Sequence, residues 1–328
     1  MNRLVAMLSA SLAALTLLSL LPSQAQAQRA TSDRPINLFV GFAAGGPADT
    51  LARIMADQLH QQTGQPVIVQ NRPGAGGTIA ATAVAKAEPD GTSLFLASSG
   101  HAGASSLYPN LPFDSQKDFS AIIALAQSPI VLAVKGDSPY RTIQDLLAAM
   151  KASPGKLNFG TGGGGATLTA LAAVLLQRDL GYDAVGVNFR GSGPANLALT
   201  AGTIDFQFDT VSGAVGLLTG GTLRGLVVTS PQRSAVLPTV PTVAETVKPG
   251  FDVTGWFGIL APAGIDPAAV ESLNRSFNDI LGTASVRQRL AGLGLDPIGG
   301  TPKQFADLIA SETVRWGELI RELGLKPE

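Results

Sequence analysis

Cysteine is absent from this 328-residue sequence, which excludes disulfide bonds, thiolate catalysis and cysteine-based zinc sites. Histidine is scarce, since His60 and His101 are the only two, so a transition-metal site is not expected either. Aromatic residues make up only 5% of the chain, but the apolar fraction of 45% is sufficient for a packed core. With 38 glycines and 21 prolines, this composition predicts many tight turns between strands and helices rather than disorder.

An excess of positive charge is also missing. The chain has 23 Lys and Arg against 24 Asp and Glu, whereas nucleic-acid binding needs clustered basic residues, so no nucleic-acid partner is expected. The Walker A and G-x-S-x-G patterns are absent. Residues 160–165 formally match G-x-G-x-x-G, but the next predicted strand ends at Phe189 and Arg190 instead of an acidic residue that would hold a ribose. We therefore expect no cofactor.

Long apolar runs are lacking except at the beginning of the chain. Arg3 precedes the apolar residues 4–21, and residues 25–27 (Ala-Gln-Ala) fit a signal-peptidase site. A membrane anchor is the alternative interpretation, because the run is nearly long enough to span a bilayer. The Pro22 break and the cleavage motif favour a signal peptide over residues 1–27, cleaved near Ala27, and hence export from the cytoplasm.

Residues 42–49 join a predicted strand to a predicted helix. The apolar run 36–40 precedes them, and apolar residues recur at helical spacing from Thr50 onward. Pro47 suits the first position of a helix, and Asp49 places a carboxylate in its first turn. Because the first amides of a helix have no helical partners, this turn predicts a site for an anion.

A second turn repeats this pattern 147 positions later. Phe-Arg-Gly-Ser-Gly-Pro-Ala-Asn at residues 189–196 aligns with Phe-Ala-Ala-Gly-Gly-Pro-Ala-Asp at residues 42–49, with Asn196 in the place of Asp49. The glycine before each proline is expected to leave no room for a side chain. Ligands of open α/β sheets bind at the carboxyl ends of strands, so the two turns predict two lobes that present helix N-termini to one cleft.

Strand and helix signals alternate along the chain, as in sheets covered by helices. An apolar crossing at residues 119–135, split at Pro129, and a return crossing near residue 253 connect the two lobes. We expect lobe I to comprise residues 28–128 and 253–328, and lobe II residues 129–252. After residue 267 only helices are expected. Further strands are predicted at residues 66–70, 93–97, 156–159, 184–188, 204–208 and 223–229.

Ser98, Ser99 and His101 follow the third predicted strand at the same edge as the first turn. One interpretation makes His101 a hydrogen-bond donor to a ligand, and another makes it a simple loop residue. A third is a secreted α/β hydrolase or transferase that uses Ser98 or Ser99 with His101, in which case a carboxylate from elsewhere must orient the histidine. Trp256 and Phe257 lie on the return crossing. One interpretation makes them aromatic residues packed at the hinge, and the alternative is that they contact the ligand.

Taken together, the motifs of the chain resemble those of the tripartite tricarboxylate transporter receptor family, the Bug-type extracytoplasmic solute-binding proteins. The resemblance extends over essentially the whole chain after residue 27. It rests on the first turn and on residues 71–77 (Asn-Arg-Pro-Gly-Ala-Gly-Gly), 87–92 (Ala-Glu-Pro-Asp-Gly-Thr), 154–160 (Pro-Gly-Lys-Leu-Asn-Phe-Gly), 189–194, 238–242 (Pro-Thr-Val-Pro-Thr) and 256–258 (Trp-Phe-Gly).

The resemblance implies an α/β, two-lobed periplasmic-binding-protein-like fold of type II, in which each lobe is a mixed sheet flanked by helices and the ligand cleft lies between the lobes. Receptors of this family capture small organic anions, usually carboxylates, through backbone amides and ordered water. The receptors deliver these anions to the membrane permease subunits of a tripartite transporter. A receptor whose main partner is a sensor kinase instead of a permease is an alternative that the sequence leaves open. We therefore expect a monomeric periplasmic receptor without catalytic activity.

Matched by position, the resemblance assigns ligand binding to fifteen residues. Two departures from the family affect the distal half of the ligand: residues 189–191 are Phe-Arg-Gly where Tyr-Lys-Gly is usual, and residues 166–169 lack the Ser-His pair that often opens the next helix. The assigned residues are Phe42, Ala43, Gly45, Gly46, Asp49, Ser98, Ser99, His101, Thr161, Gly162, Thr167, Phe189, Arg190, Gly191 and Asp209.

Overall fold

The structure, a computed structural model, describes residues 34–108, 110–162 and 167–324. The predicted signal peptide and residues 163–166 of the glycine-rich loop lie outside the described residues. Within them, strands and helices alternate as the sequence predicts. Most of the expected strands agree with the observed ones to within one or two residues.

Ten strands of the described chain form one curled sheet that changes partners along its longest strand, β4 (Phe119–Lys135). Pro129 of β4 pairs with Thr254, and the next residue, Ile130, pairs with Thr210, so the partner strand changes at this point. The first half of β4 belongs to a sheet with the order β2 (Val67–Asn71), β1 (Ile36–Val40), β3 (Ser93–Ser98), β9 (Thr254–Pro262), β4 and β10 (Asp296–Gly299). The second half belongs to a sheet with the order β8 (Leu223–Val228), β4, β7 (Phe206–Thr210), β5 (Asn158–Gly162) and β6 (Val185–Phe189).

Each half-sheet combines three parallel strands with antiparallel strands. In the first sheet β1, β2 and β3 are parallel, and in the second β5, β6 and β7 are parallel. Strands β4 and β9 run antiparallel to their neighbours. The carboxyl ends of the parallel strands are the edges where turns into helices arise, and these edges carry both glycine-proline turns.

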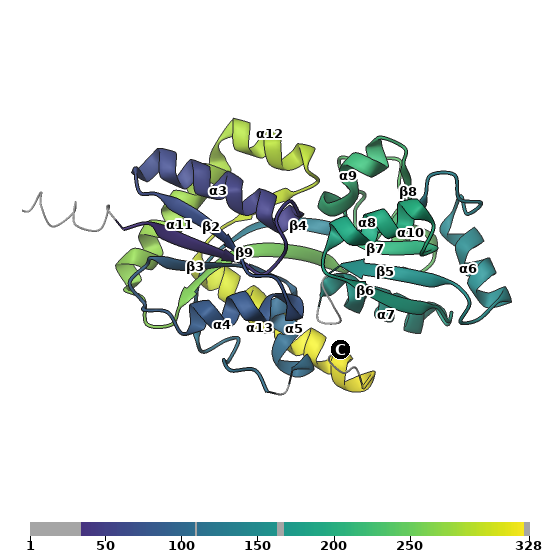
Figure 1. Ribbon diagram of the computed structural model, residues 1–328, viewed down its shortest axis with the longest axis horizontal. Coiled ribbons are helices and arrows are strands. Elements are labelled where there is room, and N and C mark those ends of the chain that lie inside the picture. The colour runs from purple at the N-terminus through teal and green to yellow at the C-terminus, as the bar shows by residue number, and fades with distance from the viewer. Residues whose placement is uncertain (1–33, 109, 163–166, 325–328) are drawn as a thin grey trace, which may run out of the picture.

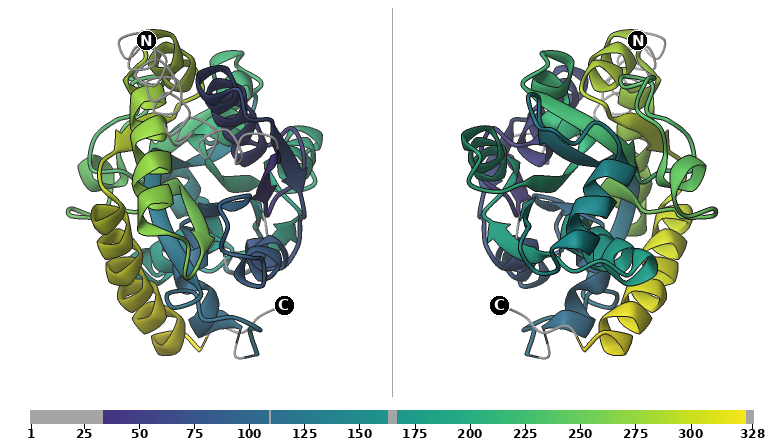
Figure 2. Two further views of the ribbon diagram at one scale, coloured as in Figure 1. Left: turned by 90° about the vertical axis from the view of Figure 1, so that its left-hand side faces the viewer. Right: turned by 90° about the vertical axis from the view of Figure 1, so that its right-hand side faces the viewer.

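Helices cover the sheets and give two lobes joined by β4 and β9, which run between them in Figure 1. The side views of Figure 2 show α13, in yellow, along one side of the molecule. Helix α13 packs against α5 and β4, so the C-terminal segment returns to the first lobe as the sequence predicts. The helices are α3 (Pro47–Thr63), α4 (Thr78–Ala85), α5 (Gly100–Leu107), α6 (Ile143–Ala152), α7 (Leu168–Leu180), α8 (Ser192–Ala201), α9 (Val211–Thr219), α10 (Val243–Thr246), α11 (Pro267–Gly282), α12 (Ala284–Gly292) and α13 (Pro302–Glu322), with a short 3₁₀ turn at Ala75–Gly77.

Three features differ from the sequence predictions. Residues 119–135 form one uninterrupted strand, because both ends of β4 find partners on either side of Pro129. Strand β10 lies in a region that was expected to contain only helices; its four residues, Asp-Pro-Ile-Gly, are too few for an alternating pattern, and its proline is tolerated at a sheet edge. Helix α8 begins at Ser192, two residues before the proline that the alignment with the first turn places at the helix start.

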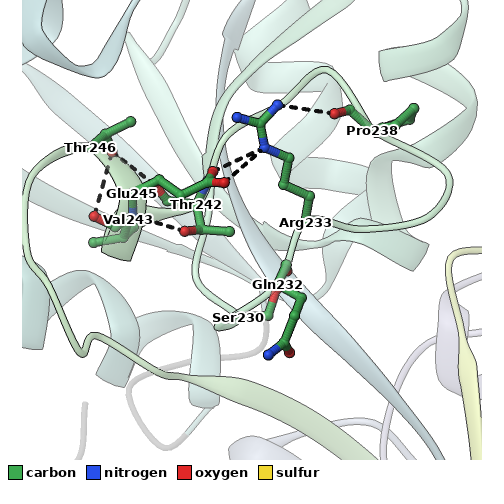
Figure 3. Close-up of polar contacts among 8 residues, drawn as sticks. All are labelled: Ser230, Gln232, Arg233, Pro238, Thr242, Val243, Glu245 and Thr246. Atoms are coloured by element: carbon green, nitrogen blue, oxygen red, sulfur yellow. Dashed lines mark hydrogen bonds and ion pairs between the residues drawn. The ribbon is translucent and has the colours of Figure 1, made fainter.

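A polar cluster around Arg233 fixes the segment that follows β8 (Figure 3). The Arg233 side chain donates to both carboxylate oxygens of Glu245, at 3.1 and 3.0 Å, and to the carbonyl of Pro238 at 3.2 Å. Glu245 and Thr242 form a reciprocal cap at the start of α10. Both charged side chains are 44% exposed, so solvent screens this ion pair and its contribution to stability is small.

Candidate ligand-binding cleft

A cavity of about 220 Å³ lies where the two sheets meet. Its walls come from the turns after β1 and β6, from the ends of β3, β5 and β7, and from the crossing strands β4 and β9. Both predicted helix N-termini therefore face the same space. The lining residues are 42–48, 98–100, 130, 162, 167–169, 191–194, 209–210 and 255–257.

The first turn is held by Asp49, which lies beneath it. Its Oδ2 accepts hydrogen bonds from the Gly45 amide and from Nε of Arg53, both at 2.9 Å. Its Oδ1 accepts from Nδ2 of Asn71 at 3.0 Å, and the same amide nitrogen donates to the Phe42 carbonyl. Gly45 has φ +83°, a conformation that glycine adopts easily. The carboxylate therefore shapes the turn instead of lining the cavity.

Asp49 is stabilised in its ionised form. Burial by itself raises the pKa of this carboxyl, but the hydrogen bonds from Arg53, the Gly45 amide and Asn71 outweigh burial and hold the pKa below its usual value. Arg53 is an i,i+4 partner on α3 and is bound to the carboxylate, so it is not directed into the cavity.

The second turn is built around a different carboxylate, Asp209, at the end of β7. Its Oδ1 accepts from Oγ of Ser192 at 2.6 Å and from the Thr210 amide at 2.8 Å. Its Oδ2 accepts from Nε2 of Gln207 at 3.1 Å and more weakly from Nδ2 of Asn196 at 3.4 Å. The side chain of Asp209 lines the cavity but is 1% exposed.

No cation of the described chain pairs with Asp209. Its burial raises the pKa to about 6, and the hydrogen bonds from Ser192, Thr210, Asn196 and Gln207 only partly offset this effect. The carboxylate is therefore ionised at neutral pH but takes up a proton in mildly acidic solution.

Gly213 allows helix α9 to approach this carboxylate. A Cβ atom at this position would lie 2.6 Å from Oδ1 of Asp209 and 2.6 Å from Oγ of Ser192. Such distances are too short for any real Cβ contact, so glycine is required here by the close approach and not by its φ angle.

The turn glycines, in contrast, have room for a side chain. A Cβ at Gly46 would meet only the Ala43 carbonyl at 3.5 Å, and a Cβ at Gly193 would meet nothing within 4 Å. The prediction that a side chain would crowd these turns is therefore wrong. Neither glycine has a positive φ.

The middle of the cavity is apolar. Ile130 of β4, Leu168 of α7 and the β9 aromatics Trp256 and Phe257 line it. Trp256 packs edge-on against Phe305 at 5.2 Å between ring centres, and its Nε1 is buried without a partner in the described chain. Trp256 is therefore packed as predicted, and it also lines the cavity, while its contact with a ligand stays a prediction.

The structure brings ten of the fifteen predicted site residues to the cavity and places the other five elsewhere. Asp49 lies beneath its turn, Thr161 is buried and donates to Asn188 at 2.6 Å, and Arg190 is exposed. The ten that line the cavity are Phe42, Ala43, Gly45, Gly46, Ser98, Ser99, Gly162, Thr167, Gly191 and Asp209; Phe189 and His101 complete the five that do not.

His101 is a core residue of a helix, so the interpretation as a simple loop residue is wrong, and the side chain does not line the 220 Å³ cavity. It lies in α5, is 5% exposed, and its Nε2 is 2.9 Å from the Ser115 carbonyl. Its ring contacts Phe95, Phe113 and Phe119 at centroid distances of 5.8, 6.1 and 5.0 Å. Burial lowers its pKa to about 4, so the imidazole is neutral at pH 7.

Several cavity residues are not among those that the sequence predicts, above all Ser192 and Thr210. The signal for Ser192 was its place inside the repeated turn, two residues after Arg190. No local pattern marks Asn196 as a partner of Asp209, because α8 and β7 meet only in the fold, whereas Gln207 lies two residues before Asp209 on the same strand.

Two classes of site are not found among the described residues. They contain no group of three or more His, Cys, Asp or Glu side chains that could hold a metal ion. None of the helices in residues 34–108, 110–162 and 167–324 is long and apolar enough to cross a membrane.

Comparison with known proteins gives a consistent result. Residues 51–325 match the model of the tripartite tricarboxylate transporter family receptor. Protein BugT of Bordetella pertussis is 36% identical, over 89% of this chain and 90% of its own length.

Two of the similar solved structures hold a carboxylate ligand. R. palustris Rpa4515 with adipate has a TM-score of 0.86, 30% identity and coverage of 91% of this chain and 99% of its own. MatC (Rpa3494) from Rhodopseudomonas palustris with bound malate has a TM-score of 0.82, 34% identity and coverage of 88% and 99%. The chain therefore belongs to the tripartite tricarboxylate transporter receptor family, whose Bug-type members are two-lobed solute-binding proteins.

Proposed function

We propose that this protein is an extracytoplasmic receptor that holds a small organic carboxylate in the cleft and delivers it to a tripartite tricarboxylate-type membrane transporter. The observation that carries the proposal is the meeting of two helix N-termini, one from each lobe, at one cavity. Unpaired amides at a helix start are suited to bind an anion. Two structural relatives are described with adipate and with malate, which supports a carboxylate ligand.

The ligand is held by backbone amides and hydroxyl groups, not by an arginine. Among the described lining residues there is no Lys, Arg or His. Arg53 is engaged by Asp49, and Arg190 is exposed and does not line the cavity. Ser98 lines the cavity and makes no side-chain hydrogen bond within the described chain, so its hydroxyl is available to a carboxylate oxygen.

Receptor activity is favoured over the alternative hydrolase. A serine nucleophile needs a base within hydrogen-bond reach. His101 faces aromatic rings and the Ser115 carbonyl, and no hydrogen bond joins it to Ser98 or Ser99 within the described residues. The Ser99 hydroxyl instead accepts weakly from the Trp256 amide at 3.4 Å. Incubation with a panel of esters and amides distinguishes the two functions, since a receptor binds without turnover.

The lobes close over the ligand by bending at the two crossing strands. We place the lobe boundaries at residues 128/129 and 252/253, near the point where β4 changes its partner strand. The protein acts as a monomer in the periplasm, and a sensor kinase is the alternative partner to a permease. Small-angle scattering should show a smaller radius of gyration with saturating ligand, and an unchanged radius would contradict closure.

Titration calorimetry with adipate and with malate tests the binding mode. Gly46→Asp and Gly193→Asp should each weaken binding at least about tenfold, because the new carboxylate competes for the amides that hold the ligand. Gly46→Ala and Gly193→Ala are matched controls, since the structure has room for Cβ at both positions, and they should bind almost normally. Equal binding by the Asp and Ala variants would rule out the amide site.

A further inference from the structure

The described lining of the cleft contains a single ionisable side chain, and that side chain is an acid. Asp209 lines the cavity with its neighbour Thr210, and no charged group of the described residues is bonded to it. A buried carboxylate is unexpected in the lining of a site that binds carboxylates, because like charges repel each other in a medium of low dielectric constant.

Ser192 lines the cavity next to this carboxylate and is hydrogen-bonded to it. Its Oγ lies 2.6 Å from Oδ1 of Asp209, a separation typical of a hydroxyl that donates to a carboxylate. The Thr210 amide donates to the same Oδ1 at 2.8 Å, which marks this oxygen as an acceptor. The hydroxyl proton of Ser192 is therefore directed toward Asp209.

A serine hydroxyl has one proton and two lone pairs. With the proton committed to Asp209, only the lone pairs of Ser192 are available to a ligand. We propose that Ser192, oriented by Asp209, is a hydrogen-bond acceptor that selects ligands carrying a donor group, namely a hydroxyl, an ammonium or an un-ionised carboxyl, at the second-turn end of the cleft. This inference rests on the proposed carboxylate-receptor function and defines the class of ligand more narrowly.

The groups around Asp209 keep it an acceptor. Ser192 and Asn196 face it from α8, Gln207 from its own strand and Gly213 from α9, while its partner on β4 is Val131. None of these residues carries a charge. Burial raises the pKa of Asp209 to about 6, so it remains an ionised acceptor at pH 7.5.

Calorimetry at pH 7.5 with two matched ligand pairs tests the inference. The pairs are 6-hydroxyhexanoate against hexanoate, and malate against succinate; in each pair the first acid has a donor that the second lacks. We expect the donor-bearing acid of at least one pair to bind about tenfold more tightly to the wild-type protein. Adipate, doubly ionised at this pH, should bind more weakly than 6-hydroxyhexanoate.

Two variants and a control assign the preference to Ser192. Ser192→Ala should abolish the preference within a pair, and Asp209→Asn, whose amide can donate to Ser192, should abolish or reverse it. Ser98→Ala, which removes a cleft hydroxyl with no acid behind it, should weaken both members of a pair by a similar factor. Melting curves establish that each variant is folded.

The outcomes are distinguishable. The inference is wrong if the acids bind but the wild-type protein shows no preference within either pair, or if Ser192→Ala keeps the preference. The receptor function stands in both cases. If none of the five acids binds, the proposed function fails, and the inference fails with it.

Discussion

The two turns that line the cleft are alike in sequence, but the carboxylate beside the first turn is paired with an arginine and the carboxylate beside the second turn has no such partner in the part of the chain that the structure describes. Asp49 and Asn196 occupy the same position in the two aligned octapeptides. In the first turn the acid is intrinsic, accepts from the Gly45 amide and is neutralised by Arg53. In the second turn the equivalent residue is an amide, which donates to an acid on a neighbouring strand, Asp209, that pairs with no cation of the described residues.

This difference gives the second turn a role in selectivity that the first turn lacks. The Asp49 carboxylate is paired with groups of its own turn, so the N-terminal amides of α3 can attract an anion. No cation of the described chain compensates the charge of Asp209, and on our proposal this charge acts through Ser192, so that the second turn distinguishes donors from acceptors. On our proposal both turns thus supply amides to the ligand, and the second turn adds selectivity through Ser192.

Gly213→Ala should have the largest effect, because it disrupts the Asp209 carboxylate and the Ser192 hydroxyl bonded to it. The new Cβ lies 2.6 Å from Oδ1 and 2.8 Å from Oδ2 of Asp209, so the carboxylate or helix α9 must move. Overpacking of this kind costs about 3 kcal/mol of unfolding free energy. Gly216→Ala in the same helix meets nothing within 4 Å and should be neutral or slightly stabilising. Urea unfolding measures both, and equal stabilities would show that α9 moves aside without cost.

Asp209→Asn should change how stability depends on pH. The folded pKa of Asp209, about 6, lies above the usual 3.8, so the wild-type protein loses stability as the pH rises from about 4 to 6. A shift of one pKa unit corresponds to about 1.4 kcal/mol, so the free energy of unfolding falls by at most about 3 kcal/mol over this range. Relative to wild type, the variant should gain stability over this range and show no further gain above pH 7. Urea unfolding from pH 4 to 8 measures this effect. A stability difference between variant and wild type that does not depend on pH would show that the pKa of Asp209 is not raised in the folded protein.

Asp49→Ala should give the opposite pH dependence with a smaller effect. The substitution removes the acceptor of the Gly45 amide and of the Asn71 side chain, at a cost of about 2 kcal/mol near neutral pH. The pKa of Asp49 is lowered in the folded state, so its contribution is present above the usual Asp pKa and is lost as the pH falls. The stability difference between wild type and variant should therefore shrink on acidification, and a difference that grows would contradict the contrast between the turns.

The sequence predicted those parts of the fold and cleft that depend on local pattern. Pro47 at the first helical position and the strand before it are as expected, because periodicity and proline geometry act within a few residues. The position of His101 was missed, since the helix at Gly100–Leu107 is rich in glycine and serine and has no strong helical signal. The Ser192–Asp209 pair was missed as a pair because it joins residues 17 positions apart on different elements, and only packing brings them together.

Arg190→Ala should have the smallest effect of the four, although it removes the cation of the second turn. Arg190 is exposed, forms no ion pair within the described residues and does not line the cavity. We expect less than a threefold change in the affinity for malate or adipate, and a larger effect on the association rate than on dissociation, because an exposed charge acts mainly by steering. That effect should diminish at high salt. Stopped-flow binding at two salt concentrations, together with calorimetry, measures both quantities. If Arg190→Ala abolishes binding while Gly193→Asp binds normally, the second lobe captures its ligand through a cation, and the contrast drawn between the two turns is wrong.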